Sequence, residues 1–207
     1  LSQLRVFHFG TAWSGSGSSP RKGKAQLEED GSNTALVLRN LLKDEENRRK
    51  LLNLAGVLLP FVEDVNVDRF PGQSLLVELQ ESHSGERYLP ASLLSEGTIK
   101  VIALVIALYF ENKRVMAFEE PAISLHPKLI SQLMQMMKEV SEEKQIFVTT
   151  HNPEVIRHVE LENLYLVSRD EDGFSKITKP GDSEIVHSFL ENELGIDDLF
   201  VDDLLSL

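Results

Sequence analysis

The sequence predicts an α/β fold in which a mainly parallel sheet is flanked by helices. From residue 95 onward, helical and strand-like stretches alternate, which is typical of a parallel sheet covered by helices on both faces. Before that point, residues 61–89 alternate apolar and polar side chains around Pro-Gly and His-Ser-Gly-Glu turns, which indicates an antiparallel patch. The predicted fold is therefore α/β with a helical and antiparallel β insertion ahead of the segment at residue 95.

The first 60 residues predict a short strand, a loop and two helices. The strand is LRVFHF, and the stretch 10–31, rich in Gly, Ser and charge, follows it as a loop that includes the linker-like GSGSS. Ser32 is the predicted N-cap of a helix through NTALVLRNLL. A second helix is predicted over residues 45–58, because Pro60 stops it.

The part after residue 95 predicts three helices and three strands. The helices are GTIKVIALVIALYFEN, LHPKLISQLMQMMKEVSEE and a short one near PEVIRHV, and the strands are RVMAF, QIFVTT and NLYLVS. One crossover helix joins RVMAF to QIFVTT, so we expect these strands to be parallel. Their carboxyl ends then lie on the same edge of the sheet, where open α/β sheets bind ligands.

Composition and charge exclude several classes of protein. The chain has 207 residues, 42% of them hydrophobic, which suffices for one domain or one domain with a small appendage. The longest apolar stretch, 101–110, is half of the roughly 20 residues that span a bilayer. No cysteine is present, which excludes disulfides and thiolate metal sites, and the amino terminus has no signal-peptide pattern. We expect a cytoplasmic protein with no membrane partner.

Charge is distributed unevenly along the chain. Residues 1–50 carry nine Lys/Arg and six Asp/Glu, whereas no Lys or Arg follows Lys179 and eight acidic residues do. An acidic tail repels a phosphate backbone, and we interpret it as solvated surface. If nucleic acid binds, the candidate contacts are Arg21, Lys22 and Lys24 and the basic run 48–50, although runs of this size are usually solvated surface as well.

Polar side chains follow the two adjacent strands at their carboxyl ends. Glu119 and Glu120 end RVMAF, and Thr149, Thr150 and His151 end QIFVTT. One carboxylate can hold Mg²⁺, a second can accept a proton from an attacking water, and a hydroxyl or imidazole can bond a terminal phosphate oxygen. Helix capping explains the acid pair taken alone, but the combined pattern predicts a metal-bound phosphate ester as ligand.

A second feature is the stretch LLSEGTIKVIALVIAL, a helix that is apolar nearly all round. Ser95 precedes the helix, and Glu96, Gly97 and Thr98 form its first turn. A small hydroxyl residue and a glycine leave backbone N–H groups open to an anion. An N-cap on a core helix is the simpler interpretation of Ser95 when this feature stands alone.

Together these motifs resemble the carboxy-terminal half of ABC-type ATPase domains in the branch that includes SMC proteins, RecF and the OLD-family ATPases. The motifs are LSEGT with its buried helix, a strand ending FEEP, SLHP and a strand ending TTHNP, in matching order and spacing from Ser95 to about Ser168. The resemblance implies an ABC-type P-loop NTPase fold, ATP and Mg²⁺ as cofactors, and a homodimer or related ATPase protomer as partner. It divides the chain into residues 1–90, with the insertion, and the carboxy-terminal lobe 91–207.

The resemblance also implies roles at the dimer interface. Ser95, Glu96, Gly97 and Thr98 would be the signature motif, which contacts the γ-phosphate of a nucleotide held by the opposite protomer. Glu96 and Thr98 stand where transporters have glycine and glutamine, which argues against a transporter subunit. Ser124 and His126 would belong to the D-loop across the dimer seam, with His126 in place of its aspartate.

Three further residues are assigned to catalysis by the same resemblance. Glu119 would be the Walker B acid that orders the magnesium shell, where aspartate is more usual. Glu120 would be the general base that polarises the hydrolytic water. His151 would be the switch residue that reads the γ-phosphate.

A Walker A motif, G-x-x-x-x-G-K-[ST], is absent from the sequence. The segment GSSPRKGK at 17–24 is one residue too long between its glycines, and Ala25 replaces the required hydroxyl. We expect the Walker A lobe upstream of Leu1 or on another stretch of chain, and very weak nucleotide binding by this polypeptide alone.

The predicted function is ATP binding and hydrolysis, with ATP-driven dimerisation that controls a DNA-related or defence effector such as a nuclease. The alternative is a non-catalytic nucleotide sensor or dimerisation scaffold, and Glu120 favours the enzyme because a sensor needs no base. A metal nuclease built on Glu119, Glu120, His126 and His151 is a weaker hypothesis, since the two acids sit on a turn beside a proline. Asp64 and Asp68 alternate on a predicted strand and are expected to face solvent.

Overall fold

The computed structural model describes residues 3–9, 26–69, 75–90, 93, 95–191, 195–202 and 204–206. These residues divide into two compact units, Leu1–Thr149 and Thr150–Leu207, and each unit is described by itself. Most of the predicted loop, with its basic residues at 21, 22 and 24, lies outside the described residues. The predicted boundary at residues 90 and 91 falls within the first unit and stays a prediction.

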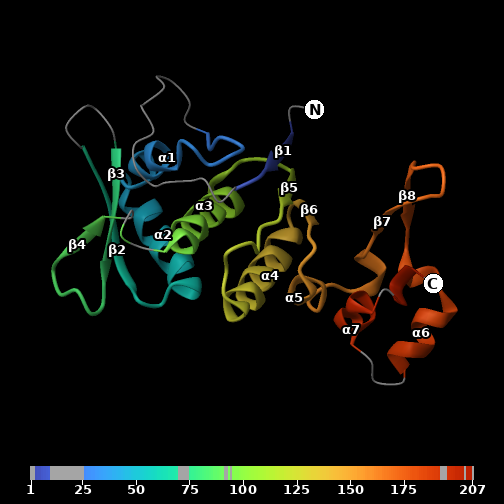
Figure 1. Ribbon diagram of the computed structural model, residues 1–207. Helices are drawn as coiled ribbons and strands as arrows, with labels where there is room; N and C mark the ends of the chain where they lie inside the picture. The colour runs from blue at the N-terminus through green and yellow to red at the C-terminus, as the bar shows by residue number, and fades with distance from the viewer. Residues whose placement is uncertain are drawn as a thin grey trace. The chain divides into compact units, whose positions relative to one another are not determined.

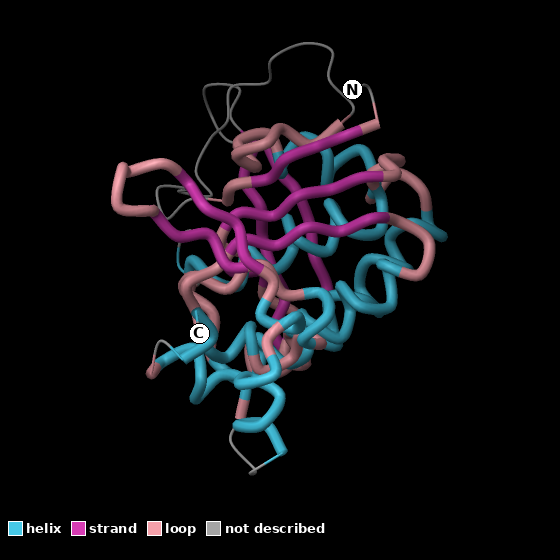
Figure 2. Tube along the Cα trace, turned by 90° about the vertical axis from the view of Figure 1, so that its right-hand side faces the viewer, coloured by secondary structure: helices cyan, strands magenta, loops and turns pink. Residues whose placement is uncertain are grey.

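The first unit contains the predicted parallel sheet, here called sheet A. Its strands are β1 (Leu4–Phe7), β5 (Val115–Glu119) and β6 (Gln145–Thr149), in the order β1-β5-β6 and all parallel. Figure 2 shows these strands side by side with helices behind them. The crossover between β5 and β6 is α4 (Pro127–Ser141), so the parallel pairing of these two strands is confirmed.

The predicted antiparallel patch is also confirmed. Sheet B consists of β2 (Val62–Arg69), β3 (Leu75–Glu81) and β4 (Tyr88–Pro90), paired antiparallel in that order. Alternate side chains of β3 are buried, which places one face of the sheet on the core. The alternation of apolar and polar residues in the sequence therefore corresponds to alternating burial along β3.

The expectation that Asp64 faces solvent is wrong. Its carboxylate accepts hydrogen bonds from the guanidinium of Arg48 on α2 and from the hydroxyl of Tyr88 on β4. The hydrogen bond to Asp64 raises the pKa of the Tyr88 hydroxyl, because loss of the phenolic proton would place two negative charges together. Asp64 therefore ties a helix to sheet B, whereas Asp68 is exposed as expected.

The helices α1 (Thr34–Leu41) and α2 (Glu45–Leu58) pack against sheet B. The predicted bounds of α2 are confirmed, and the Asp44 side chain caps it by accepting a hydrogen bond from the backbone N–H of Asn47, at 2.9 Å. Ser32 does not cap α1, because Asn33 occupies the N-cap position. The Asn33 side chain bonds the preceding loop instead, where its Oδ1 accepts from Glu28 N at 2.7 Å.

The core of the first unit surrounds α3 (Glu96–Phe110), as the apolar sequence of that helix predicts. Figure 1 shows α1, α2, α3 and α4 between sheet B and sheet A. The inward face of sheet A contributes Phe7, Met116 and Phe118, with the rings of Phe7 and Phe118 stacked at 5.3 Å between centroids. The other face of sheet A carries exposed Leu4, Val6 and Phe147, so helical cover on both faces stays a prediction.

The second unit combines a two-stranded hairpin with short helices. Its strands are β7 (Leu166–Arg169) and β8 (Ser175–Thr178), paired antiparallel. Its helical segments are α5 (Pro153–Ile156), η2 (Leu161–Asn163), η3 (Pro180–Asp182), α6 (Glu184–Glu191), α7 (Ile196–Val201) and η4 (Leu204–Ser206). A small core forms around Leu161, Val186, Leu199 and Leu205. Among the described residues, no helix combines the length and apolar character that crossing a membrane requires.

The strand NLYLVS was expected to continue the parallel alternation, and this expectation is wrong. The strand β7 pairs with β8 in sheet C instead of joining sheet A. A tight turn returns the chain, with Gly173 at φ 84° and the Asp170 side chain accepting from Phe174 N at 2.7 Å. Glycine adopts this left-handed backbone conformation without steric cost, so the turn closes a local hairpin.

The acidic tail is not uniformly solvated, which corrects the expectation that it is solvated surface. Asp197 is buried, and its Oδ2 accepts from Arg157 Nε at 2.9 Å and from Arg157 Nη2 at 2.5 Å. These hydrogen bonds from Arg157 lower the pKa of the Asp197 carboxyl below its usual value. At least one acid of the tail therefore has a structural partner within the second unit.

Candidate functional site

The carboxyl edge of sheet A brings the ends of β5 and β6 together. Glu119 is the register partner of Thr149, and the backbone N–H of Glu120 donates to Thr149 O at 3.0 Å. The side chain of Glu119 is exposed, and that of Glu120 is half-buried. Both carboxylates therefore leave the sheet at its carboxyl edge, where the sequence predicts the ligand.

The loop after β5 holds two non-glycine residues in the left-handed region. Glu120 has φ 44° and Ser124 has φ 64°. Such conformations cost about 1–3 kcal/mol each and persist only where surrounding contacts enforce them. Here Ile123 N donates to Glu120 O at 3.2 Å, and Leu125 N donates to Ala122 O at 3.1 Å. The loop that carries Glu120 is thus strained and fixed by its own hydrogen bonds.

Ser95 is the N-cap of α3, so the simpler interpretation of this residue is confirmed. Its Oγ accepts from Thr98 N at 3.2 Å and lies 2.8 Å from Thr98 Oγ1. Thr98 itself is buried. The Ser95 cap orders the first turn, which also contains Glu96 and Gly97, at the positive end of the helix dipole. Contact of this turn with a phosphate stays a prediction.

Gly97 places the start of α3 directly against the loop after β5. A Cβ atom at Gly97 would lie 2.9 Å from Ser124 O and 3.5 Å from Leu125 Cδ2. Because the nearest atom is a backbone carbonyl oxygen, the neighbour cannot yield as a flexible side chain would. The structure therefore brings together two segments that are distant in the sequence, 95–98 and 120–124, through a contact that requires glycine.

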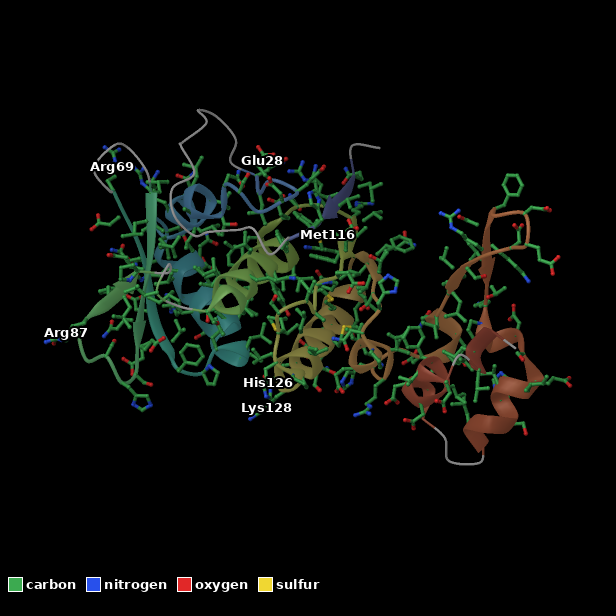
Figure 3. The ribbon with its side chains drawn as sticks, viewed as in Figure 1. Glu28, Arg69, Arg87, Met116, His126 and Lys128 are labelled. Carbon is green, nitrogen blue, oxygen red and sulfur yellow. The ribbon has the colours of Figure 1, made fainter. Side chains whose placement is uncertain are left out.

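His126 occupies the N-cap position of α4. Its Nδ1 accepts from Lys128 N at 3.2 Å, and the ring is exposed. Figure 3 shows His126 and Lys128 next to each other at the start of this helix. The side chain thus has a structural use as a cap, and its assignment to a dimer seam stays a prediction.

His151 follows β6 by two residues and belongs to the second unit. Its ring is exposed. The residues around it begin α5, with Asn152 Oδ1 accepting from Glu154 N at 2.9 Å and Thr150 Oγ1 accepting from Asn152 N at 3.0 Å. This turn fixes the backbone next to His151, and reading of a γ-phosphate by its side chain stays a prediction.

A magnesium ion bound with a nucleotide at the edge of sheet A stays a prediction. Among the described residues, no three or more His, Asp or Glu side chains form a group that could hold a metal ion. Mg²⁺ in nucleotide sites takes one or two carboxylates and completes its shell with phosphate oxygens and water. Glu119 ends β5 and Glu120 follows it, so two carboxylates of the kind that such a site uses come from this edge.

Lys100 on α3 also belongs to this region, although no motif in the sequence indicated it. Its side chain is 5% exposed, and its Nζ donates to Glu120 O at 3.2 Å and to Ile123 O at 3.1 Å. The signal was present in the sequence, because Lys100 is the single charged residue in the stretch TIKVIALVIALYF. Its partners could not be read from the sequence, since they are backbone atoms about 20 residues away.

Comparison with known proteins places these features in a family. Residues 17–157, more than half of the chain, match the family model described as "AAA domain, putative AbiEii toxin, Type IV TA system". A curated relative, the uncharacterized protein MJECL43 of Methanocaldococcus jannaschii, is 30% identical over 98 residues, which cover 46% of this chain and 25% of the relative. The chain thus matches about a quarter of the length of that relative.

Solved structures similar to the chain are SMC head domains. An SMC head bound to the C-terminal winged-helix domain of ScpA has a TM-score of 0.53 and 18% identity, covering 70% of this chain and 48% of that one. A structure from work on ATP-driven dimerization and DNA-stimulated activation of SMC ATPases has a TM-score of 0.53 and 16% identity, covering 77% and 96%. The Smc head of Pyrococcus furiosus, bound to the C-terminal domain of ScpA, has a TM-score of 0.50 and 16% identity. This match covers 80% of this chain and 44% of that one. The predicted α/β P-loop NTPase fold is thereby confirmed.

Proposed function

The chain belongs to the AAA-domain family whose model matches residues 17–157, a family of nucleotide-binding ATPase domains, and from this premise we propose that it hydrolyses Mg²⁺-bound ATP within a dimer. The observation that carries this proposal is the strained backbone turn at Glu120, a half-buried residue at the carboxyl edge of sheet A. Non-glycine residues with a left-handed backbone are concentrated at functional sites, because their steric strain persists only where the surrounding structure enforces it.

The proposed chemistry divides between the two adjacent acids. Glu119 lies at the exposed end of β5 and would hold the magnesium shell, which neutralises phosphate charge when the nucleotide is bound. Glu120 would accept a proton from the attacking water, and its backbone is anchored to Thr149 and to Ile123. His151 would donate a hydrogen bond to the γ-phosphate.

The dimer is proposed because the start of α3 can present backbone N–H groups to an anion, as the resemblance to the signature motif implies. Ser95 to Thr98 would contact the γ-phosphate bound by the partner protomer, with Ser124 and His126 at the seam between the protomers. One similar structure comes from a study of ATP-driven dimerization in SMC ATPases, which supports this arrangement. Dimer closure would control a DNA-related or defence effector in the cytoplasm, and the toxin–antitoxin wording of the family description supports a defence role.

The test is Glu120→Gln in the full-length protein. We expect ATP turnover to fall about 10²–10⁴-fold, as for loss of a general base, while ATP still binds and the ATP-bound dimer persists. The matched control is Glu86→Gln, which makes the same change at an exposed turn of sheet B. Turnover is measured by phosphate release, and the dimer by size-exclusion chromatography with light scattering.

Two results would contradict the proposal. Unchanged turnover in Glu120→Gln would remove Glu120 from the catalytic machinery. ATP-dependent dimerisation of the unaltered protein without any hydrolysis would instead identify a nucleotide sensor or dimerisation scaffold, which is the alternative function.

A further inference from the structure

Lys100 is a buried lysine of the first unit, and it contacts the backbone of the proposed base, Glu120. It follows Gly97 by three residues, so both lie on the same side of the first turns of α3. Its side chain is 5% exposed, and Nζ donates to two backbone carbonyls of the loop after β5, Glu120 O at 3.2 Å and Ile123 O at 3.1 Å. A buried ammonium group destabilises the folded protein unless it is hydrogen-bonded, so loss of these two contacts would be strongly unfavourable.

The two carbonyls that Lys100 holds bracket the strained turn. Glu120 O accepts from Lys100 and also from Ile123 N at 3.2 Å, and Glu120 N donates to Thr149 O at 3.0 Å. The backbone of Glu120 is therefore anchored to β6 on one side and to α3 on the other. Without the contact from α3, the left-handed conformation at Glu120 would have less support against its steric cost.

The same stretch of α3 touches this loop at a second point. Gly97, in the turn capped by Ser95, packs against Ser124 O so closely that a Cβ would lie 2.9 Å from it. The start of α3 and the loop 120–124 therefore contact each other through Gly97 and through Lys100. A shift of either segment would change the hydrogen bonds or the packing of the other, because interiors are close-packed and do not deform freely.

We propose that Lys100 is a positioning residue that couples the Ser95–Thr98 segment to the carboxylate of Glu120. The inference rests on the proposed function, in which the first segment contacts the partner's nucleotide and Glu120 acts on the nucleotide of its own protomer. When the partner's γ-phosphate engages the start of α3, Lys100 holds the Glu120 turn in the geometry for proton transfer. Turnover then depends on dimer formation through a contact within one protomer.

Lys144 provides a matched control at the other end of the same helix. Its Nζ donates to Leu108 O at 2.7 Å and to Glu111 O at 3.0 Å, and the residue is half-buried. Lys100 and Lys144 thus make the same kind of contact, a lysine that bonds two backbone carbonyls at an end of α3. Lys144 lies next to none of the proposed site residues in the sequence, and its carbonyl partners end the helix.

The experiment compares Lys100→Met with Lys144→Met in the full-length protein. Both variants lose two lysine–carbonyl hydrogen bonds and are expected to unfold at lower temperature than the unaltered protein. Lys100→Met should in addition lower kcat for ATP about 10–100-fold with KM within about threefold, because a misplaced catalytic group costs rate rather than substrate binding. Lys144→Met should keep kcat per folded molecule within about threefold of the unaltered protein.

A combined variant tests whether Lys100 acts through Glu120. In the Glu120→Gln background, Lys100→Met should cause no further loss of residual turnover, because groups that act as one unit are not additive. If Lys100→Met does not give folded protein, Lys100→Arg replaces it, since Arg keeps the charge but moves the donor atoms. Lower kcat at unchanged KM supports the inference for this variant as well.

The outcomes separate the inference from the proposed function. If Glu120→Gln is inactive but the Lys100 variant retains the kcat of Lys144→Met, the coupling role of Lys100 is overturned and the ATPase assignment stands. A further loss of tenfold or more in the combined variant would likewise overturn action through Glu120. If Glu120→Gln retains full turnover, the proposed function itself fails.

Discussion

Gly97 is the position at which one added methyl group tests the contact between α3 and the loop after β5. In Gly97→Ala the new Cβ would lie 2.9 Å from Ser124 O, closer than carbon and oxygen approach in ordinary packing. The oxygen cannot move alone, since the adjacent carbonyl of Ile123 is bonded to Lys100. The variant must therefore shift either the helix start or the loop.

The magnitude follows from two opposing effects. Overpacking of a well-packed site costs about 1–3 kcal/mol. Replacement of Gly by Ala inside a helix stabilises by up to about 1 kcal/mol, because the unfolded chain loses conformational freedom. The same replacement at Gly56 in α2 meets no atom within 4 Å and should give only the favourable effect. The difference between the two variants isolates the steric cost, about 1–3 kcal/mol.

Urea denaturation followed by circular dichroism measures both variants against the unaltered protein. We expect Gly56→Ala to raise the free energy of unfolding by about 0.5–1 kcal/mol. The free energy of unfolding of Gly97→Ala should be lower than that of Gly56→Ala by about 1–3 kcal/mol, the steric cost. Equal stabilities of the two variants, within about 0.5 kcal/mol, would refute the close contact between Gly97 and Ser124.

Two further predictions concern ion pairs outside the site. The pKa of Asp197 is lowered in the folded protein by hydrogen bonds from Arg157, so its contribution to stability is present above the unfolded value of 3.8 and is lost as pH falls through the lower folded pKa. Asp197→Asn should therefore lower the melting temperature at pH 7, and the difference from the unaltered protein should shrink below pH 3.8 in a melting series; a constant difference would contradict this. Arg48→Met should destabilise the protein by about 1–3 kcal/mol, because Asp64 loses a charged hydrogen-bond donor, whereas Arg49→Met at an exposed position should change stability by less than about 0.5 kcal/mol. Equal effects of these two arginine changes in urea denaturation would show that the Asp64 contact is not stabilising.

The elements that could be predicted from sequence are those whose signals are local. The end of α2 followed from the proline after it, and the burial of α3 followed from its continuous apolar run. The parallel pairing of β5 with β6 followed from a single crossover helix, because the handedness and length of such connections leave few alternatives. The placement of Glu119 and Glu120 at a shared sheet edge followed from that pairing.

Other features depend on contacts between residues far apart in the chain, which no local pattern encodes. A four-residue strand such as β7 is compatible with either sheet, and the choice of β8 as its partner depends on the turn at Gly173 and on the packing of the second unit. The hydrogen-bond partners of Asp64 and of Lys100 depend on which backbone and side-chain atoms the fold brings within hydrogen-bond distance. Periodicity and caps act over a few residues and so specify the elements, whereas packing and long-range hydrogen bonds specify how the elements meet at the candidate site.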